Sequence, residues 1–255
     1  MRAFGLTDQG KRRERNEDSL LVDNETGLYI AADGMGGHSQ GEVASRTAVT
    51  VINDFLKEGL KQAGAGKTRE DGGIEDLLKG AIFSANAVVY EHSLKLNGDI
   101  MGTTVSLLLL KERRAYIAHV GDSRIYRLRK DRIEKLTMDH NKAQELVDAC
   151  LLTEEEADNH RSSHVLTRAL GSSSSVNPDI AEHHLAGGDS FLLSTDGLFR
   201  AVGIDTVQAV MTARLSVEEK CRKLVSLSLE GGAPDNVSVI VVESEKKGIL
   251  TRIFS

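Results

Sequence analysis

The stretch from Leu28 to Gly41 constrains the fold more than any other part of this 255-residue chain. Its apolar run Leu-Tyr-Ile-Ala-Ala ends at Asp33, and three glycines follow within four residues before helical spacing of apolar residues begins. The run predicts a buried strand that ends in a carboxylate, and the glycines allow a sharp turn. A carboxylate beside an exposed glycine carbonyl is half of a site for a hard cation. The rest of the chain would have to supply the other half.

The composition is that of an ordinary globular protein, and it excludes several classes of function. The chain is 40% hydrophobic and 27% charged, with a formal net charge of −6, no Trp and no basic stripe, so no nucleic-acid partner is expected. Cys150 and Cys221 lack paired spacing, which argues against disulfides and zinc and makes the cytoplasm the expected compartment. No run of about 18 apolar residues occurs, so no membrane span is expected.

Hydrophobic periodicity predicts strands and helices in separate blocks. Helices with one apolar face are expected at 41–60, 74–96, 202–211 and 217–230. Strands are expected at 2–7, 19–22, 28–32, 103–110, 115–120, 124–128, 133–136, 180–185, 190–194 and 237–242. The four strands between 103 and 136 are expected to form one antiparallel meander. Segregated helices and mostly antiparallel strands predict an α+β fold, with two sheets and helices packed outside them.

A polar segment at 139–170 interrupts the run of strands and is expected to form a flap over a site. Inside it, the sequence Thr153-Glu-Glu-Glu is typical of a capped helix start. Because no linker separates two cores, residues 1–242 are expected to form a single domain. The remaining residues, 243–255, are expected to form a tail.

Acidic residues recur where an apolar strand meets a turn. If the strands pack together, these acids can converge at one edge, where they repel each other and their pKa values rise unless a cation is present. Oxygen ligands alone favour Mg²⁺ or Mn²⁺. Two such ions about 3.5–4 Å apart would lower the pKa of a shared water and make it a nucleophile. The acids are Glu17, Asp18, Asp33, Asp122, Asp196 and Asp235.

A phosphoryl substrate would also need a cationic side chain, and Arg13 is the candidate because it lies in the same loop as Glu17 and Asp18. A planar guanidinium can bind two phosphate oxygens side by side, which lysine cannot do. Taken alone, each motif is also ordinary turn chemistry: an Asp-Gly turn, a solvated arginine, or Asp122 paired with Arg124. The repetition of the pattern favours a functional site.

These motifs together make the chain resemble the PP2C-type (PPM) metal-dependent protein serine/threonine phosphatases, in their compact bacterial form. The resemblance implies a four-layer α-β-β-α sandwich, with two central antiparallel sheets flanked by helix pairs. It also implies hydrolysis of phosphoserine and phosphothreonine on proteins. The motifs, in the order of the family, are Asp8-x-Gly10-x-x-Arg13-x-x-Asn16-Glu-Asp18, Ala32-Asp-Gly-Met-Gly-Gly-His38, Gly41-Glu-Val-Ala-Ser45, Met101-Gly-Thr-Thr104, Gly121-Asp-Ser-Arg124, Leu193-Ser-Thr-Asp-Gly-Leu198 and Asp235-Asn-Val-Ser-Val239.

The resemblance implies a core of two Mn²⁺ or Mg²⁺ ions that share a bridging water as the nucleophile. Asp33 would bridge the two ions, with the Gly34 carbonyl on one of them, and Asp196 and Asp235 would bind the other. Arg13 would bind the substrate phosphate. The implied catalytic residues are therefore Arg13, Asp33 and Asp196.

Further metal ligands are implied around this core. Glu17 and Asp18 would act directly or through water. Asp122 and Asp196 would hold a third, weaker ion of the kind found in bacterial members of the family.

One position departs from the animal members of the family, which carry a His directly after the Asp-Gly as a proposed general acid. This chain has Met35 there, as is usual in the bacterial branch, and Met cannot donate a proton. The expected donor is therefore a metal-bound water on the Asp122 ion. His38, three residues further on, is the alternative.

The implied partners are phosphoserine and phosphothreonine proteins and a cognate transmembrane serine/threonine kinase, and the chain is expected to act as a monomer in signalling. Two alternatives come from other classes. A pseudoenzyme would bind phosphoproteins without cleaving them, but all the expected carboxylates and Arg13 are present. A hydrolase of small phosphoesters or nucleotides would need another specificity, and nothing in the sequence forms a pocket for a base.

Overall fold

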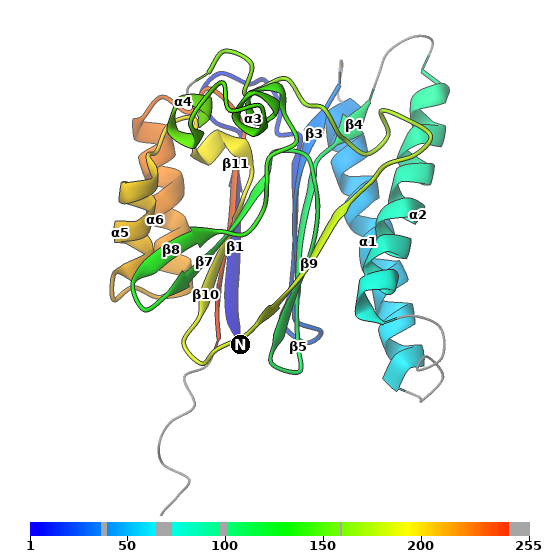
Figure 1. The fold of residues 1–255 in the computed structure, drawn as a ribbon, viewed down its shortest axis with the longest axis horizontal. Helices are drawn as coiled ribbons and strands as arrows, with labels where there is room; N and C mark the ends of the chain where they lie inside the picture. Colours follow the sequence, from blue (N-terminus) through cyan, green and yellow to red (C-terminus); the bar gives the residue numbers. More distant parts are fainter. Residues whose placement is uncertain (37–39, 65–72, 97–100, 159, 245–255) are drawn as a thin grey trace, which may run out of the picture.

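Two antiparallel β-sheets lie face to face at the centre of the molecule, and a pair of helices covers each outer face (Figure 1). This computed structural model describes residues 1–36, 40–64, 73–96, 101–158 and 160–244. The predicted α+β fold, a four-layer α-β-β-α sandwich, is therefore confirmed.

The first sheet, called sheet A here, is antiparallel throughout, and the helices α5 (Ile204–Thr212) and α6 (Val217–Glu230) cover its outer face. A capping box starts α6, in which Ser216 and Glu219 bond each other's backbone. The strand order of sheet A is β1 (Arg2–Asp8), β11 (Val237–Glu243), β10 (Ser190–Ser194), β7 (Arg124–Arg129) and β8 (Arg132–Lys135).

The second sheet, sheet B, carries the helices α1 (Gln40–Gly64) and α2 (Ile74–Leu94) on its outer face. Its order is β2 (Asp18–Asp23), β3 (Leu28–Met35), β5 (Val105–Lys111), β6 (Arg114–Val120) and β9 (Asp179–His184), and the short β4 (Gly102–Thr103) pairs with β3.

The central strands are apolar on both faces because each sheet is covered twice. In β3, Leu28 and Ile30 pack under the helices of sheet B, whereas Tyr29 and Ala31 pack between the two sheets. All four side chains are fully buried. This double burial explains why the strands read as continuous apolar runs instead of alternating ones.

The predicted four-strand meander is wrong in one respect. β5 pairs with β6 in sheet B and β7 pairs with β8 in sheet A, so the chain changes sheets between Val120 and Arg124. Gly121 makes this crossing with a φ of +108°, and a Cβ there would come within 2.5 Å of the Thr104 side chain. The crossing places Asp122 where the two sheets meet.

The predicted flap contains two short helices, α3 (Lys142–Asp148) and α4 (Glu154–Asp158), which lie at one end of the sandwich (Figure 1). The Asn141 side chain accepts a hydrogen bond from the Gln144 amide and caps α3. The capped helix start at Thr153 is confirmed, because Thr153 and Glu156 bond each other's backbone amides. Each of the two flap helices therefore begins with its own side-chain cap.

Two predictions fall partly or wholly outside the described residues. They are the alternative proton donor His38 and most of the predicted tail, of which residue 243 is the last residue of β11. Across the parts of the chain that the structure describes, no helix has the length and apolar character that crossing a membrane requires.

Candidate functional site

The predicted acids come together at the end of the sandwich that carries the flap. Asp18 begins β2 directly opposite Asp33 in β3, and these two residues belong to sheet B. Asp196 follows β10 as the first residue of the short helix η1 (Asp196–Leu198), and Asp235 directly precedes the turn into β11, so both belong to sheet A. With Asp122 at the crossing, both sheets contribute carboxylates to one place.

Asp33 lies at the centre of this group. Its amide donates to the Thr104 hydroxyl at 2.9 Å, and its carbonyl accepts from the Thr104 amide and the Thr103 hydroxyl, both at 2.9 Å. Burial raises the pKa of Asp33 well above its usual range, and the negative charges of Asp18 and Asp196 raise it further. The backbone is thus fixed while the carboxylate faces other carboxylates.

Asp18 is buried with only one of its oxygens satisfied. Oδ2 accepts hydrogen bonds from Thr195 at 2.9 Å and Ser238 at 2.6 Å. Oδ1 is buried and has no hydrogen-bond partner among the described residues. Burial raises the pKa of Asp18 to about 7, even though the two hydroxyls act in the opposite direction.

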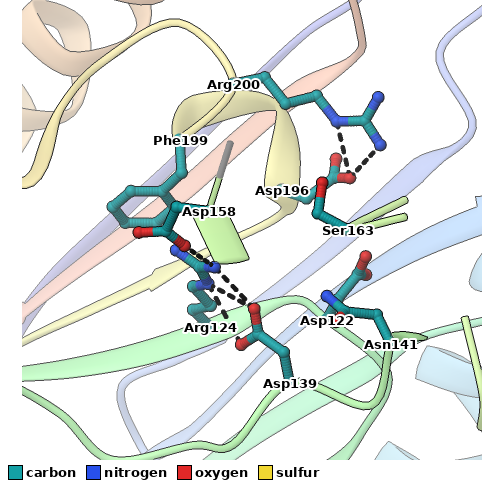
Figure 2. Close-up of a pocket in the computed structure, with 9 residues that line it drawn as sticks. All are labelled: Asp122, Arg124, Asp139, Asn141, Asp158, Ser163, Asp196, Phe199 and Arg200. Carbon is teal, nitrogen blue, oxygen red and sulfur yellow. Dashed lines mark hydrogen bonds and ion pairs between the residues drawn. The ribbon is translucent and has the colours of Figure 1, made fainter. Parts of the chain in front are cut away.

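Asp196 repeats this arrangement with a different donor. Oδ2 accepts from Arg200 through Nε at 2.8 Å and through Nη2 (Figure 2). Oδ1 is buried and, within the described part of the chain, unpaired. Burial raises the pKa of Asp196 although Arg200 counteracts it. Two buried carboxylates therefore each present a bare oxygen.

Asp122 lines a small cavity of about 50 Å³ together with Asn141 and Ser163 from the flap and with Asp196 and Arg200 from η1 and its continuation (Figure 2). The residue is only 6% exposed. Burial raises the pKa of Asp122 well above its usual range, and the charge of Asp196 adds to this effect. The alternative interpretation of Asp122, a turn residue paired with Arg124, is not supported, because Arg124 donates to Asp139 instead.

Asp235 differs from the others because both of its oxygens are engaged. Oδ1 accepts from the Asn236 amide at 2.9 Å, and Oδ2 accepts from Arg13 Nη2 at 2.7 Å. The Arg200 Nη1 lies 3.4 Å from the same Oδ2. Two guanidiniums therefore converge on one oxygen of this acid.

Arg13, the predicted phosphate ligand, lies beside the acids as expected. Its side chain is 50% exposed, and among the described residues Asp235 is the only partner of its guanidinium. Its other N–H groups have no partner among the described residues, which leaves donors for the oxygens of a phosphate.

Glu17 and Gly34 are held together by backbone contacts. The Gly34 amide donates to the Glu17 carbonyl at 3.1 Å, and a Cβ on Gly34 would come within 2.1 Å of the Gly41 carbonyl oxygen. Burial raises the pKa of the Glu17 carboxyl, against the influence of Arg13. Glycine is required at position 34 because the backbones pack too closely for a side chain.

Met35 lies at the end of β3, where its Cε is 2.6 Å from the position that a Cβ on Gly102 would take. Its side chain thus packs against the backbone of β4. Met35 therefore has a packing role here.

The sequence did not reveal the residues that organise the site. Asn236 donates to the carbonyls of Gln9 and Arg15, both at 2.8 Å, and accepts from the Glu17 amide at 2.9 Å. One side chain thus fixes the loop that carries Arg13. The Asp-Asn pair before the last strand was the only sequence signal for Asn236, and Arg200 gave none.

The donor set fits Mg²⁺ or Mn²⁺, because it is made of oxygens, includes two bare buried carboxylate oxygens and carries more acids than cations. Among the described residues, no three acidic, histidine or cysteine side chains converge closely enough to form a ready-made metal cage. Arg13 forms an ion pair with Asp235, and Arg200 forms one with Asp196. A cation would draw these carboxylates together.

Comparison with known proteins gives a consistent result. Residues 8–230 match the family Protein phosphatase 2C. A serine/threonine phosphatase of Listeria welshimeri is 36% identical over 250 residues, which cover 95% of this chain and 96% of that protein.

Two solved structures are also similar. The serine/threonine phosphatase PstP/Ppp of Mycobacterium tuberculosis aligns with a TM-score of 0.83 at 33% identity, over 96% of this chain and 98% of that one. The catalytic domain of the phosphatase PstP in complex with two manganese ions aligns with a TM-score of 0.80 at 32% identity, with the same coverage.

Proposed function

The chain belongs to the protein phosphatase 2C family and is a serine/threonine protein phosphatase, and from this premise we propose how its own residues perform the reaction. Asp33, Asp196 and Asp235 would hold two Mn²⁺ or Mg²⁺ ions, with the Gly34 carbonyl as a further ligand. The observation that carries the proposal is the pair of buried, bare carboxylate oxygens on Asp18 and Asp196. A relative of similar fold is in complex with two manganese ions.

The remaining acids complete this proposal. Glu17 and Asp18 would bind the ions directly or through water, and Asp122 with Asp196 would hold a third, weaker ion. The raised pKa values of Asp18 and Asp122 support it: burial raises them most and neighbouring carboxylates add to this, and a nearby cation would stabilise the ionised forms. When bound, the divalent ions supply a water of lowered pKa as the nucleophile.

Arg13 binds the phosphoryl group of the substrate. Its guanidinium is anchored by one hydrogen bond to Asp235 and keeps its other N–H groups for the phosphate oxygens. Asn236 keeps this loop in register with the acids by its three backbone contacts. These contacts fix the loop next to Asp235, so Arg13 is held where it can orient the phosphoryl group. Met35 has no proton to give to the leaving serine or threonine oxygen.

The test is hydrolysis of a phosphothreonine peptide by the purified protein with Mn²⁺, measured as released phosphate. We expect turnover with Mn²⁺, loss of turnover in excess EDTA, and recovery when Mn²⁺ is added back. Full turnover in excess EDTA would contradict the proposal. Comparing rates on phosphopeptides with rates on nucleotides tests the alternative of a small-phosphoester hydrolase.

We further propose that residues 1–242 act as one monomeric catalytic domain in the cytoplasm and oppose a serine/threonine kinase. A phosphatase of this specificity requires an enzyme that forms its substrates, which supports a kinase partner. The test is incubation with autophosphorylated serine/threonine kinase from the same cell. Loss of phosphate from the kinase or its products is expected, and unchanged phosphorylation alongside an active phosphopeptide assay would count against this partner.

A further inference from the structure

Arg200 forms a cationic bridge between two of the proposed metal ligands. Its Nε and Nη2 donate to Asp196 Oδ2, and its Nη1 lies 3.4 Å from Asp235 Oδ2. The side chain arises one turn after Asp196, at the continuation of η1, and is 36% exposed. Neither the proposed reaction nor the sequence motifs assign it a role.

Arg200 differs from a surface arginine because three acids surround its guanidinium. The guanidinium lies among Asp122, Asp196 and Asp235, and each of these acids stabilises its positive charge. Another arginine has the same i,i+4 spacing to an acid, namely Arg222 with Glu218 on α6. That pair is exposed on the surface, with side-chain exposures of 62% and 50%, and ion pairs of this kind contribute little. Of these two i,i+4 pairs, only that of Arg200 lies among further acids.

The positions of the donors imply competition with a cation. A divalent ion shared by Asp196 and Asp235 needs both carboxylates to turn toward one point, whereas Arg200 holds Asp196 Oδ2 and reaches Asp235 Oδ2. Asp235 Oδ2 also accepts a hydrogen bond from Arg13, so two guanidiniums compete for that oxygen. A guanidinium and a dication close to the same two acids also repel each other.

We propose that Arg200 is a built-in counter-ion that competes with the divalent cation for Asp196 and Asp235 and thereby weakens cation binding at that position. This inference rests on the proposed function, because it assumes that these two acids bind a metal ion. Binding of the ion through Asp196 Oδ2 would require the guanidinium to release that oxygen.

The experiment is a calorimetric titration of the purified protein with Mn²⁺, comparing wild type with Arg200→Gln, Arg200→Lys and Arg222→Gln. R200Q removes the competing charge and is expected to bind Mn²⁺ about tenfold more tightly at the affected site, since charges a few ångströms apart interact strongly near a protein surface. R200K keeps the charge and is expected to stay within about threefold of wild type. R222Q removes the same charge from a remote pair and is expected to match wild type.

A second measurement, thermal unfolding with and without Mn²⁺, does not depend on activity. The metal-free R200Q protein is expected to unfold at a lower temperature than wild type, because two acids lose their counter-ion, and its stabilisation by Mn²⁺ is expected to be larger. A positioning role, in which Arg200 aims the bare Asp196 Oδ1 at the ion, predicts the reverse, namely weaker binding in both R200Q and R200K.

The outcomes separate this inference from the proposed function. If wild type binds Mn²⁺ and cleaves the phosphopeptide while R200Q binds equally or more weakly, the counter-ion role is overturned and the proposed function stands. If no variant, including wild type, binds Mn²⁺, both are overturned.

Discussion

Two groups of charged side chains share the cavity in Figure 2, and they differ in how their charges are matched. In the first, Arg124 donates to Asp139 through Nε at 2.9 Å and Nη2 at 2.6 Å, and also to Asp158 at 2.5 Å. Burial alone would raise the pKa of Asp139, but Arg124 holds this pKa below its usual value. In the second group, the pKa values of Asp122 and Asp196 are raised.

The two groups differ in whether each carboxylate has its hydrogen-bond donors. The Arg124 group joins β7 to the flap, since Asp158 is the last residue of α4, and each of its acids has a guanidinium partner. The Asp196 group keeps bare oxygens and more acids than cations. A buried carboxylate that lacks donors is costly unless a ligand supplies the charge. We therefore infer that the matched charges stabilise the fold and that the unmatched ones belong to the proposed cation site.

The largest expected effect comes from Asp196→Asn. We expect phosphopeptide hydrolysis with Mn²⁺ to fall roughly a thousandfold or more, equivalent to about 4 kcal/mol of transition-state stabilisation. The metal-free variant should nevertheless be at least as stable as wild type, because one of several repelling charges is gone. Rates and urea unfolding curves check the two parts. Retained activity would show that Asp196 is not a ligand.

The opposite result is expected for Arg124→Met, which breaks the matched group. Asp139 is left buried without its partner, so the free energy of unfolding should fall by about 3 kcal/mol. Urea denaturation measures this, and Arg222→Met, which breaks an exposed pair, is the control, with a loss below about 1 kcal/mol. Equal losses in the two variants would show that the Arg124 group is not the stronger of the two.

Asp18, another acid of the proposed cation site, should make the stability of the metal-free protein depend on pH. Because burial raises the pKa of Asp18 to about 7 in the folded protein, the folded state binds more protons than the unfolded state between about pH 4 and 7. Stability from this residue is therefore present at low pH and is lost as the pH rises through that window. In the metal-free protein, the stability advantage of Asp18→Asn over wild type should grow from pH 4 to pH 7.

Urea unfolding at several pH values, with EDTA, measures this difference between the two proteins. Added Mn²⁺ should reduce it, since a cation stabilises the ionised acid. An advantage of D18N that is constant with pH would contradict the raised pKa.

The smallest expected effect is that of Ser238→Ala. It removes one of the two hydroxyl donors on Asp18 Oδ2 and should cost about 1 kcal/mol of stability at neutral pH. It should also raise the pKa of Asp18 further and steepen the loss of stability with rising pH. Ser226→Ala, which removes an exposed hydroxyl bonded to Glu230, is the control and should change neither quantity.

Local patterns predicted the strands, the helices and the positions of the acids in them. A carboxylate at the end of a strand lies at that end of the sheet. These patterns could not predict the change of sheet at Gly121, since a hairpin turn and a crossing between sheets use the same residues. The partners of Arg124 and the position of Asn236 also escaped, because these contacts join segments far apart in the sequence. The sequence did not predict a role for Arg200, because that role depends on its contacts with Asp196 and Asp235 in the folded protein.

The most direct test of the central claim, that unmatched carboxylates mark the cation site, is calorimetric titration with Mn²⁺ of wild type, Asp196→Asn and Asp158→Asn. Both variants lose one acid from the walls of the same cavity. Wild type and D158N are expected to bind Mn²⁺ with similar affinity, whereas D196N is expected to bind it much more weakly or not at all. Binding by D196N that equals that of wild type, or an equal loss in D158N, would contradict it.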